Sequence, residues 1–302
     1  MSRVVSMLAL ALLPLAAAAE LDVVIIEGLG GEERYADQFA EQVDVIEQAS
    51  LGLTTAGRVK TFRSGEFSRE EVLSHFDSIG GRLAAEDRLA IFLIGHGSYD
   101  DHEYKFNIGG PDLTDADLFA LLENIAAGNI LLVNTSSSSG ATADRLKADG
   151  RTLILATRSG AERHAARFGS YFFAALNDST ADLDKNRIIS AEEAFRFAER
   201  QVSDYFERNG QLATEHPRLE GSQAARFSLA RLDDARPAQD DTALQRLLGR
   251  RDELNGDIEG LRLRRESMPA AEYQSELLER MVELATLEER IEARERELAD
   301  GN

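Results

Sequence analysis

Two apolar runs decide the fold: residues 89–97 read LAIFLIGHG, and residues 129–140 read NILLVNTSSSSG. Each run is short and continuous and ends in small polar residues, which is typical of a strand buried on both faces of a parallel sheet. The carboxyl ends of such strands meet at one edge of an open α/β sheet, where ligands bind. The sequence therefore predicts a site at that edge, containing His96 and the serine cluster.

The rest of the chain up to residue 232 alternates strand and helix patterns. Strands are expected over residues 21–27, 58–62, 89–95, 129–133, 152–156 and, least clearly, 225–230. This alternation predicts the α/β class, with a doubly wound, mostly parallel sheet and helices on both faces. A short strand is also expected over residues 104–108, followed by a helix that Thr114 caps and that runs to Ile125.

The first 19 residues resemble a secretory signal. A short basic start is followed by an apolar stretch over residues 4–15 and by Ala17, Ala18 and Ala19 before Glu20. An uncleaved anchor is the alternative, but Ser6 and Pro14 interrupt a run that is shorter than the roughly 20 residues of a bilayer span. We therefore expect export to a periplasm or the exterior, and no membrane association after cleavage.

Composition narrows the partners. The chain has 54 acidic and 34 basic residues, a net charge of -20, which argues against binding to nucleic acid or to an anionic membrane surface. It contains no cysteine, so disulfides and thiol chemistry are excluded.

The region after residue 232 has a different character. Residues 233–241 form a polar, proline-containing linker, and residues 242–302 carry apolar side chains at alternating spacings of three and four. Pro269 interrupts this pattern and favours a helical hairpin over one long helix. The hairpin packs on itself, or it forms a coiled coil that self-associates or binds a partner; the sequence leaves both open.

A strand that ends in Gly95-His96-Gly97, followed by one that ends in Ser137-Ser138-Ser139-Gly140, resembles the caspase and legumain clan of cysteine peptidases. The resemblance covers roughly residues 21–230, and the loop over residues 27–35, EGLGGEERY, matches the first strand-to-helix loop of that clan. It implies a caspase-like fold, with His96 as the catalytic histidine. It places Ser137 where the clan has its cysteine nucleophile, with Gly97, Ser136, Ser139 and Gly140 lining the site.

The serine changes the chemistry that this position can support. A thiol has a pKa near 8.5, whereas a serine hydroxyl attacks at neutral pH only with a base in hydrogen-bond reach, about 2.6–3.2 Å away. His96 is the candidate base, and Asp100, Asp101 or Glu103 are candidates to orient it.

Three interpretations of Ser137 follow. The chain is a pseudopeptidase that retains a peptide-binding cleft and acts through partner binding, an active hydrolase with Ser137 as nucleophile and His96 as general base and acid, or a protein with a serine-rich turn and no ligand. The first is our hypothesis. In it, the backbone N–H groups of Gly97 and Ser137 would still hold a peptide carbonyl.

The resemblance also implies an arginine in the substrate pocket. Arg34 lies in the matching loop, and Arg158 and Arg163 follow the expected strand over residues 152–156. A pocket with these arginines would favour an acidic or amide-bearing side chain. The alternative for each of them is a solvated surface arginine.

A second constellation consists of acidic and polar residues at the spacing of an EF-hand calcium loop, and its members are Asp182, Asp184, Asn186, Ile188, Ser190 and Glu193. Against calcium, Arg187 replaces the glycine of the sharp turn, at a cost of about 1 kcal/mol. The alternative is a capping box in which Ser190 and Glu193 begin the next helix without a metal. Calcium is the one cofactor that the sequence suggests.

Overall fold

The computed structural model describes residues 20–232, 242–265 and 268–300, so the expected signal (1–19) and linker (233–241) lie outside the described residues. The elements are β1 (Leu21–Glu27), α1 (Glu33–Leu51), η1 (Ala56–Arg58), β2 (Val59–Phe62), α2 (Arg69–Gly80), β3 (Arg88–Ile94), β4 (Gly97–Tyr99), β5 (Tyr104–Phe106), β6 (Leu113–Thr114), α3 (Asp115–Glu123), β7 (Asn129–Asn134), η2 (Ser139–Thr142), α4 (Ala143–Leu146), β8 (Arg151–Leu155), α5 (Phe168–Ala174), η3 (Ala175–Asn177), β9 (Ile188–Ser190), α6 (Ala191–Arg208), β10 (Arg218–Glu220), η4 (Ala224–Arg226), β11 (Ser228–Arg231), α7 (Thr242–Leu263) and α8 (Ala270–Asp300).

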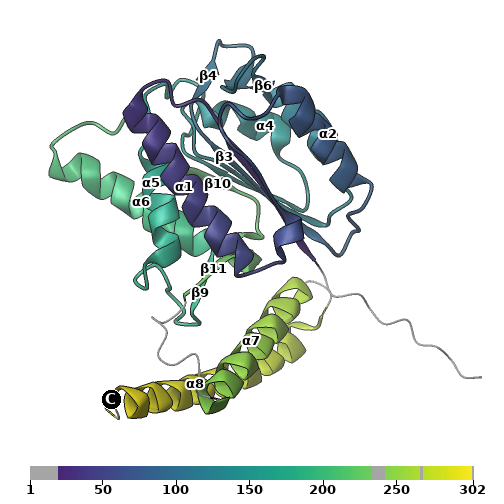
Figure 1. Cartoon of the computed structure of the whole chain (residues 1–302), viewed down its shortest axis with the longest axis vertical. Coiled ribbons are helices and arrows are strands. Elements are labelled where there is room, and N and C mark those ends of the chain that lie inside the picture. The colour runs from purple at the N-terminus through teal and green to yellow at the C-terminus, as the bar shows by residue number, and fades with distance from the viewer. Residues whose placement is uncertain (1–19, 233–241, 266–267, 301–302) are drawn as a thin grey trace, which may run out of the picture.

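A six-stranded sheet with the order β10-β8-β7-β3-β1-β2 forms the centre of the molecule (Figure 1). Its strands are parallel except β10, which pairs antiparallel with β8 at one edge. Every residue of β1 and β8 is buried, which explains the uninterrupted apolar character of the central strands. The predicted mixed α/β class with a mostly parallel sheet is confirmed.

Helices cover both faces of this sheet. Val23 and Ile25 of β1 pack in one core with α1, α5 and α6, while Val24 and Ile26 pack in a second core with α2, α3 and α4. Because successive side chains of a strand point to opposite faces, one apolar strand supplies both cores. The doubly wound arrangement is therefore confirmed as well.

The prediction for the end of the domain was wrong in part. Residues 224–226 form a 3-10 turn, and β11 pairs with β9 in a separate two-stranded sheet instead of joining the central one. The last strand of the central sheet is β10, with the sequence Arg218-Leu219-Glu220. All three of its residues are only half-buried, so this edge strand has no apolar run by which the sequence would reveal it.

The short strand expected over residues 104–108 is present as β5, within a three-stranded sheet of β4, β5 and β6. Thr114 caps α3 as predicted, with its side chain accepting the backbone N–H of Asp117. This small sheet follows directly after His96 and forms one wall of the candidate site.

The C-terminal helices α7 and α8 lie side by side as a hairpin, and α8 begins directly after Pro269 (Figure 1). They bury two small apolar clusters between them, separate from both cores of the sheet. The buried members of these clusters are Leu244, Leu287 and Ile291, and Leu254, Ile258 and Leu284. Within the described ranges, no helix has the length and apolar character that a membrane span requires.

Candidate functional site

The loops after β3 and β7 meet at one edge of the sheet. The two strands are parallel neighbours with Leu93 opposite Asn134, so His96 and Ser137 both follow strand ends at the same edge. A Cβ added to Gly97 would lie 2.5 Å from Ser136 Oγ and 2.7 Å from the Ser137 carbonyl oxygen. The structure thus brings the histidine loop and the serine loop into direct contact.

The imidazole of His96 is held in a defined orientation. Its Nε2 lies 3.1 Å from the Gly30 carbonyl oxygen, and its ring packs edge-on against Tyr35 and Phe39. Because a carbonyl only accepts, Nε2 carries the proton, and in the neutral ring Nδ1 keeps the lone pair. Gly30 is required here, since a Cβ would lie 2.5 Å from the backbone nitrogen of Ala36.

The residues expected to orient His96 are engaged elsewhere. Asp100 accepts the backbone N–H groups of His102 and Glu103, and these bonds lower the pKa of Asp100 to about 2. Asp101 pairs with Arg163 at 2.9 Å. Glu103 lies 3.5 Å from Lys105. In the described part of the chain, the hydrogen-bond partner of the His96 ring is the Gly30 carbonyl from the loop after β1, and none of the three candidate carboxylates bonds the ring.

The hydroxyl of Ser137 does not meet the imidazole. Ser137 Oγ donates to the His164 carbonyl oxygen at 2.8 Å, and the residue is only 4 % exposed. Its backbone N–H makes no hydrogen bond within the part of the chain that the structure describes. The arrangement leaves an unactivated hydroxyl beside a backbone N–H group that has no hydrogen-bond partner in the described chain.

Ser136 belongs to a buried polar network. Its Oγ lies 2.6 Å from the Tyr104 hydroxyl and donates to Asn134 Oδ1 at 2.8 Å, and Asn134 Nδ2 donates to the same tyrosine hydroxyl. Burial raises the pKa of Tyr104 to about 12, so the phenol stays protonated. This network fixes the first part of the serine loop on the end of β7.

Ser139 and Gly140 lie behind the site, where they make contacts within the protein. Ser139 Oγ and the Gly140 N–H both bond Thr157 Oγ1, at 3.2 and 2.9 Å. Between them and Ser137, Ser138 adopts a left-handed conformation with φ 57°, and its buried hydroxyl has no hydrogen-bond partner in the described chain. Strained residues of this kind cluster at functional sites.

The three arginines predicted for a substrate pocket, Arg34, Arg158 and Arg163, all remain at the surface. Arg34 is exposed, pairs with Glu32 at 3.0 Å and stacks over Tyr35, whose ring touches His96. The exposed Arg158 guanidinium lies 3.8 Å from Glu162. The ring of Tyr35 therefore separates Arg34 from His96, while Arg158 belongs to the loop that follows β8.

Sequence reasoning missed a histidine–carboxylate pair at this edge. His216 Nδ1 lies 2.6 Å from Glu162 Oε1, and the His216 backbone N–H donates to Glu162 Oε2 at 3.1 Å. His216 lies two residues before β10, whose antiparallel direction brings its start to the same edge as the ends of β7 and β8. Since 54 residues separate the partners, no local pattern marks them.

Three of the residues predicted to form a calcium loop converge in the structure. Carboxylate oxygens of Asp182, Asp184 and Glu193 lie within 4.8 Å of one another, a grouping that could hold a metal ion. Arg187 adopts the left-handed conformation expected of the missing glycine, with φ 63°. Burial raises the pKa of Asp182 above its ordinary value, because its charge has little access to solvent.

The predicted capping box is present in the same loop. Glu193 Oε2 accepts from the Ser190 N–H and hydroxyl at 2.9 and 2.7 Å, and the Glu193 N–H donates to Ser190 Oγ. Asn186 Oδ1 accepts the Ile188 N–H at 2.7 Å. The two sequence interpretations are therefore compatible, since one loop has both the carboxylate convergence and the helix cap.

The hairpin reaches this loop through charged side chains. Arg262 of α7 donates to Asp184 at 2.8 Å, and Arg187 of the loop pairs with Glu288 of α8 at 3.3 Å. The arginine in the glycine position thus has a partner on the hairpin. Two ion pairs therefore connect the hairpin to the loop, and the arginine belongs to the hairpin in one pair and to the loop in the other.

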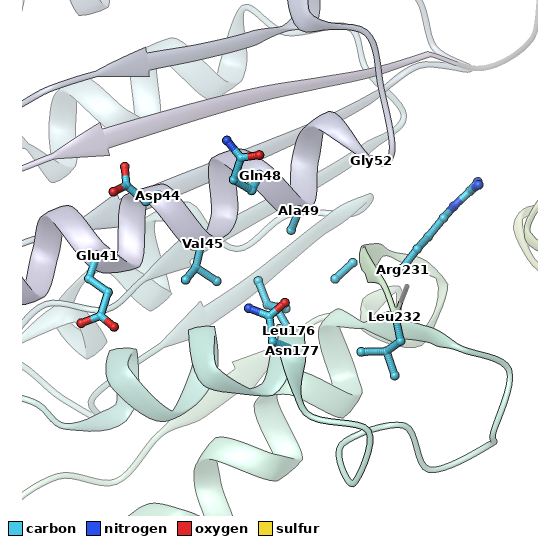
Figure 2. Close-up of a pocket in the computed structure, with 11 residues that line it drawn as sticks. Glu41, Asp44, Val45, Gln48, Ala49, Gly52, Leu176, Asn177, Arg231 and Leu232 are labelled. Atoms are coloured by element: carbon cyan, nitrogen blue, oxygen red, sulfur yellow. The ribbon is translucent and has the colours of Figure 1, made fainter. Parts of the chain in front are cut away.

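A pocket of about 620 Å³ lies away from these residues, between α1, η3 and β11 (Figure 2). Val45, Ala49 and Leu176 contribute its apolar part, and Glu41 and Asp44 lie along α1 beside it. None of the predicted site residues lines it.

Comparison with known proteins assigns this chain to no family. No family model matches it, and no curated protein matches it. Among solved structures, it is similar to protein GSU0716 from Geobacter sulfurreducens, at 12 % identity and a TM-score of 0.48, over 71 % of this chain and 100 % of that one. The structure itself shows the mixed α/β class and the mostly parallel sheet.

Proposed function

We propose that this chain is a caspase- or legumain-like pseudopeptidase, which binds an extended peptide at the carboxyl ends of β3 and β7 and acts through that binding. The proposal is supported by the adjacency of these strands and by the contact between Gly97 and the serine loop. It is also supported by the helices on both faces of the sheet, as the resemblance implies.

The orientation of Ser137 carries the proposal. Its hydroxyl donates to the His164 carbonyl, which cannot take a proton, while Nε2 of His96 is occupied by the Gly30 carbonyl. Without a base on the hydroxyl, attack on a peptide carbonyl is not assisted. The unbonded N–H of Ser137 can nevertheless hold such a carbonyl, so binding survives without cleavage.

An active serine hydrolase is the second candidate. The lone pair on Nδ1 of His96 favours it, because a rotated Ser137 hydroxyl would then have a base on the neighbouring loop. In this case Ser137 attacks the peptide carbonyl and His96 takes the hydroxyl proton and returns it to the leaving amine.

Two measurements on the mature protein separate the candidates. A fluorophosphonate probe should leave Ser137 unlabelled, and fluorescein-labelled casein should bind without being cut; Ser137→Ala should bind casein equally well. Labelling that Ser137→Ala abolishes would establish the hydrolase instead. If casein is neither bound nor cleaved, both candidates are contradicted.

Calcium binding at the loop over residues 182–193 is a second proposed function. It is favoured by the convergence of Asp182, Asp184 and Glu193 at EF-hand spacing. For a module outside the cell, a weak affinity of roughly 10⁻⁴ to 10⁻³ M suffices.

Export and self-association complete the proposal. Export predicts that the mature chain begins at Glu20, which N-terminal sequencing of the secreted protein tests. Self-association through the hairpin is supported by Leu278 and Val282, one turn apart on α8 and 66 and 58 % exposed. Replacing both with lysine should reduce any dimer seen by sedimentation.

A further inference from the structure

The segment between β8 and α5, residues 157–167, lies over the serine loop; we call it the cover loop. The Glu162 carbonyl accepts the Ser138 N–H at 2.9 Å, and the His164 carbonyl accepts the Ser137 hydroxyl at 2.8 Å. Two carbonyl groups of the cover loop thus accept hydrogen bonds from two consecutive serines. This explains why Ser137 is buried although it lies at the end of a strand, where the sheet is open.

The cover loop is seated closely on both sides. A Cβ on Gly140 would collide with the Arg158 carbonyl carbon and the Ser159 nitrogen, and a Cβ on Gly160 would collide with the ring of Tyr99. Glycine at both contacts allows the backbone to approach the serine loop and the small sheet. The closed position is therefore well defined.

One carboxylate fixes the cover loop to the sheet. Glu162 Oε1 bonds His216 Nδ1, while Oε2 accepts the backbone N–H groups of His216 and Arg158 at 3.1 and 2.9 Å. The glutamate side chain is 12 % exposed and the histidine 43 %. His216 is itself held in place, since β10 begins two residues later and pairs with β8.

The two ends of the cover loop are held by Thr157, which bonds Ser139, and by Arg167, whose N–H donates to Glu215, but its middle has few other contacts. Its sequence, TRSGAERHAAR, contains no apolar side chain larger than alanine, so it contributes little to either core. Its ion pair between Arg163 and Asp101 is exposed on both sides, and such pairs contribute little to stability. A segment with few apolar contacts opens at a lower free energy than the strands beneath it.

We propose that Glu162 and His216 form a latch that keeps the cover loop closed over Ser137, and that a peptide reaches the Ser137 N–H when this latch opens. The second part rests on the proposed function, whereas the latch itself does not. Glu162 and His216 are positioning residues in this scheme, acting on the site through the cover loop.

The lack of cysteine in this chain permits a direct test. In Ser137→Cys the only thiol lies under the cover loop, and its rate of reaction with 5,5′-dithiobis(2-nitrobenzoate) reports how often the loop opens. Adding His216→Ala should raise that rate about tenfold, and adding Glu162→Gln should raise it less, because an amide oxygen still accepts. His102→Ala, at an exposed histidine outside the latch, is the matched control and should leave the rate unchanged.

A conservative variant guards against a merely structural effect. His216→Asn retains an N–H donor near the place of Nδ1 and should restore slow labelling, with hydrogen exchange in residues 157–167 as slow as in the parent. Equal rates with and without His216→Ala would overturn the latch, as would faster exchange spread evenly over the sheet. Casein binding tests the peptide site separately: fast labelling without binding would contradict the proposed function and leave the latch standing.

Discussion

Two regions of the molecule differ in where their hydrogen bonds come from. They are the serine edge, which holds His96 and Ser137, and the carboxylate loop, residues 182–193. At the serine edge, Ser137 and His96 bond the carbonyls of His164 and Gly30, which are 27 and 66 residues distant. In the carboxylate loop, Asp182 accepts from backbone groups four and five residues away. The first region therefore depends on the assembled sheet, whereas the second forms within one short segment.

The two regions also differ in charge. The serine edge is built from neutral hydroxyls, amides and carbonyls around an apolar scaffold, with Tyr104 kept protonated by burial. The loop concentrates three carboxylates, and an arginine from α7 neutralises part of that charge. We therefore expect substitutions at the serine edge to change stability through packing, and substitutions in the carboxylate loop to change it through the binding of cations.

The largest effect is expected at the contact between the histidine and serine loops. Gly97→Ala places a methyl group 2.5 Å from Ser136 Oγ and should lower the free energy of unfolding by about 2–3 kcal/mol, measured by urea denaturation. Gly109→Ala is the matched control, because no atom lies within 4 Å of its Cβ. Equal stability of the two variants would contradict the close contact of the loops.

The next effect should come from calcium at the carboxylate loop. At ten times the dissociation constant, CaCl₂ should raise the free energy of unfolding by about 1.4 kcal/mol, since the ion binds the folded chain alone. Asp182→Asn should abolish that increment, while Glu199→Gln, an exposed glutamate on α6, should not. No increment at millimolar calcium would leave the capping box as the sole role of the loop.

The pH dependence of stability should distinguish the buried carboxyl of Glu215, next to the cover loop, from exposed carboxyls. Burial raises the pKa of Glu215, although its carboxylate accepts the backbone N–H groups of Arg167 and Phe168. Its ionised form therefore costs folded-state stability at neutral pH, and this cost falls as pH drops through the raised pKa toward 4.5, the ordinary glutamate value.

Replacing Glu215 tests this sign. Glu215→Gln removes the ionised carboxylate and its cost, so the free energy of unfolding should rise less on acidification than in the parent. The loss of hydrogen bonding should itself cost about 1 kcal/mol. Urea denaturation between neutral pH and the acid range measures it, again with Glu199→Gln as the control. An unchanged slope for Glu215→Gln would show that this carboxyl is ionised equally in the folded and unfolded states.

The smallest effect is expected where the hairpin meets the loop. The pair between Arg262 and Asp184 is partly exposed, so Arg262→Ala should cost less than about 1 kcal/mol. It should nevertheless tighten calcium binding, because the guanidinium no longer occupies Asp184. Isothermal titration calorimetry checks this, and weaker binding in the variant would show that the arginine supports the ion site.

Several features could be predicted from sequence because they repeat locally. The apolar runs predicted β3 and β7, Ser190 and Glu193 predicted the cap of α6, and Pro269 predicted the break between α7 and α8. The position of β10 could not be predicted, since an edge strand of three half-buried residues has no apolar periodicity. The partners of His96 and Ser137 were missed because both are backbone carbonyls, which every residue has.

The sequence by itself determined the α/β class, the edge at which His96 and Ser137 stand, the lack of any thiol, and the acidic character of the chain. These follow from residue type and from periods of two and near four, which act over a few residues. Only the tertiary structure decided that Gly30 orients the imidazole, that His164 takes the serine hydroxyl, and that Glu162 meets His216. Such contacts join segments far apart in the chain, and they exist only once the buried strands have fixed which loops share an edge.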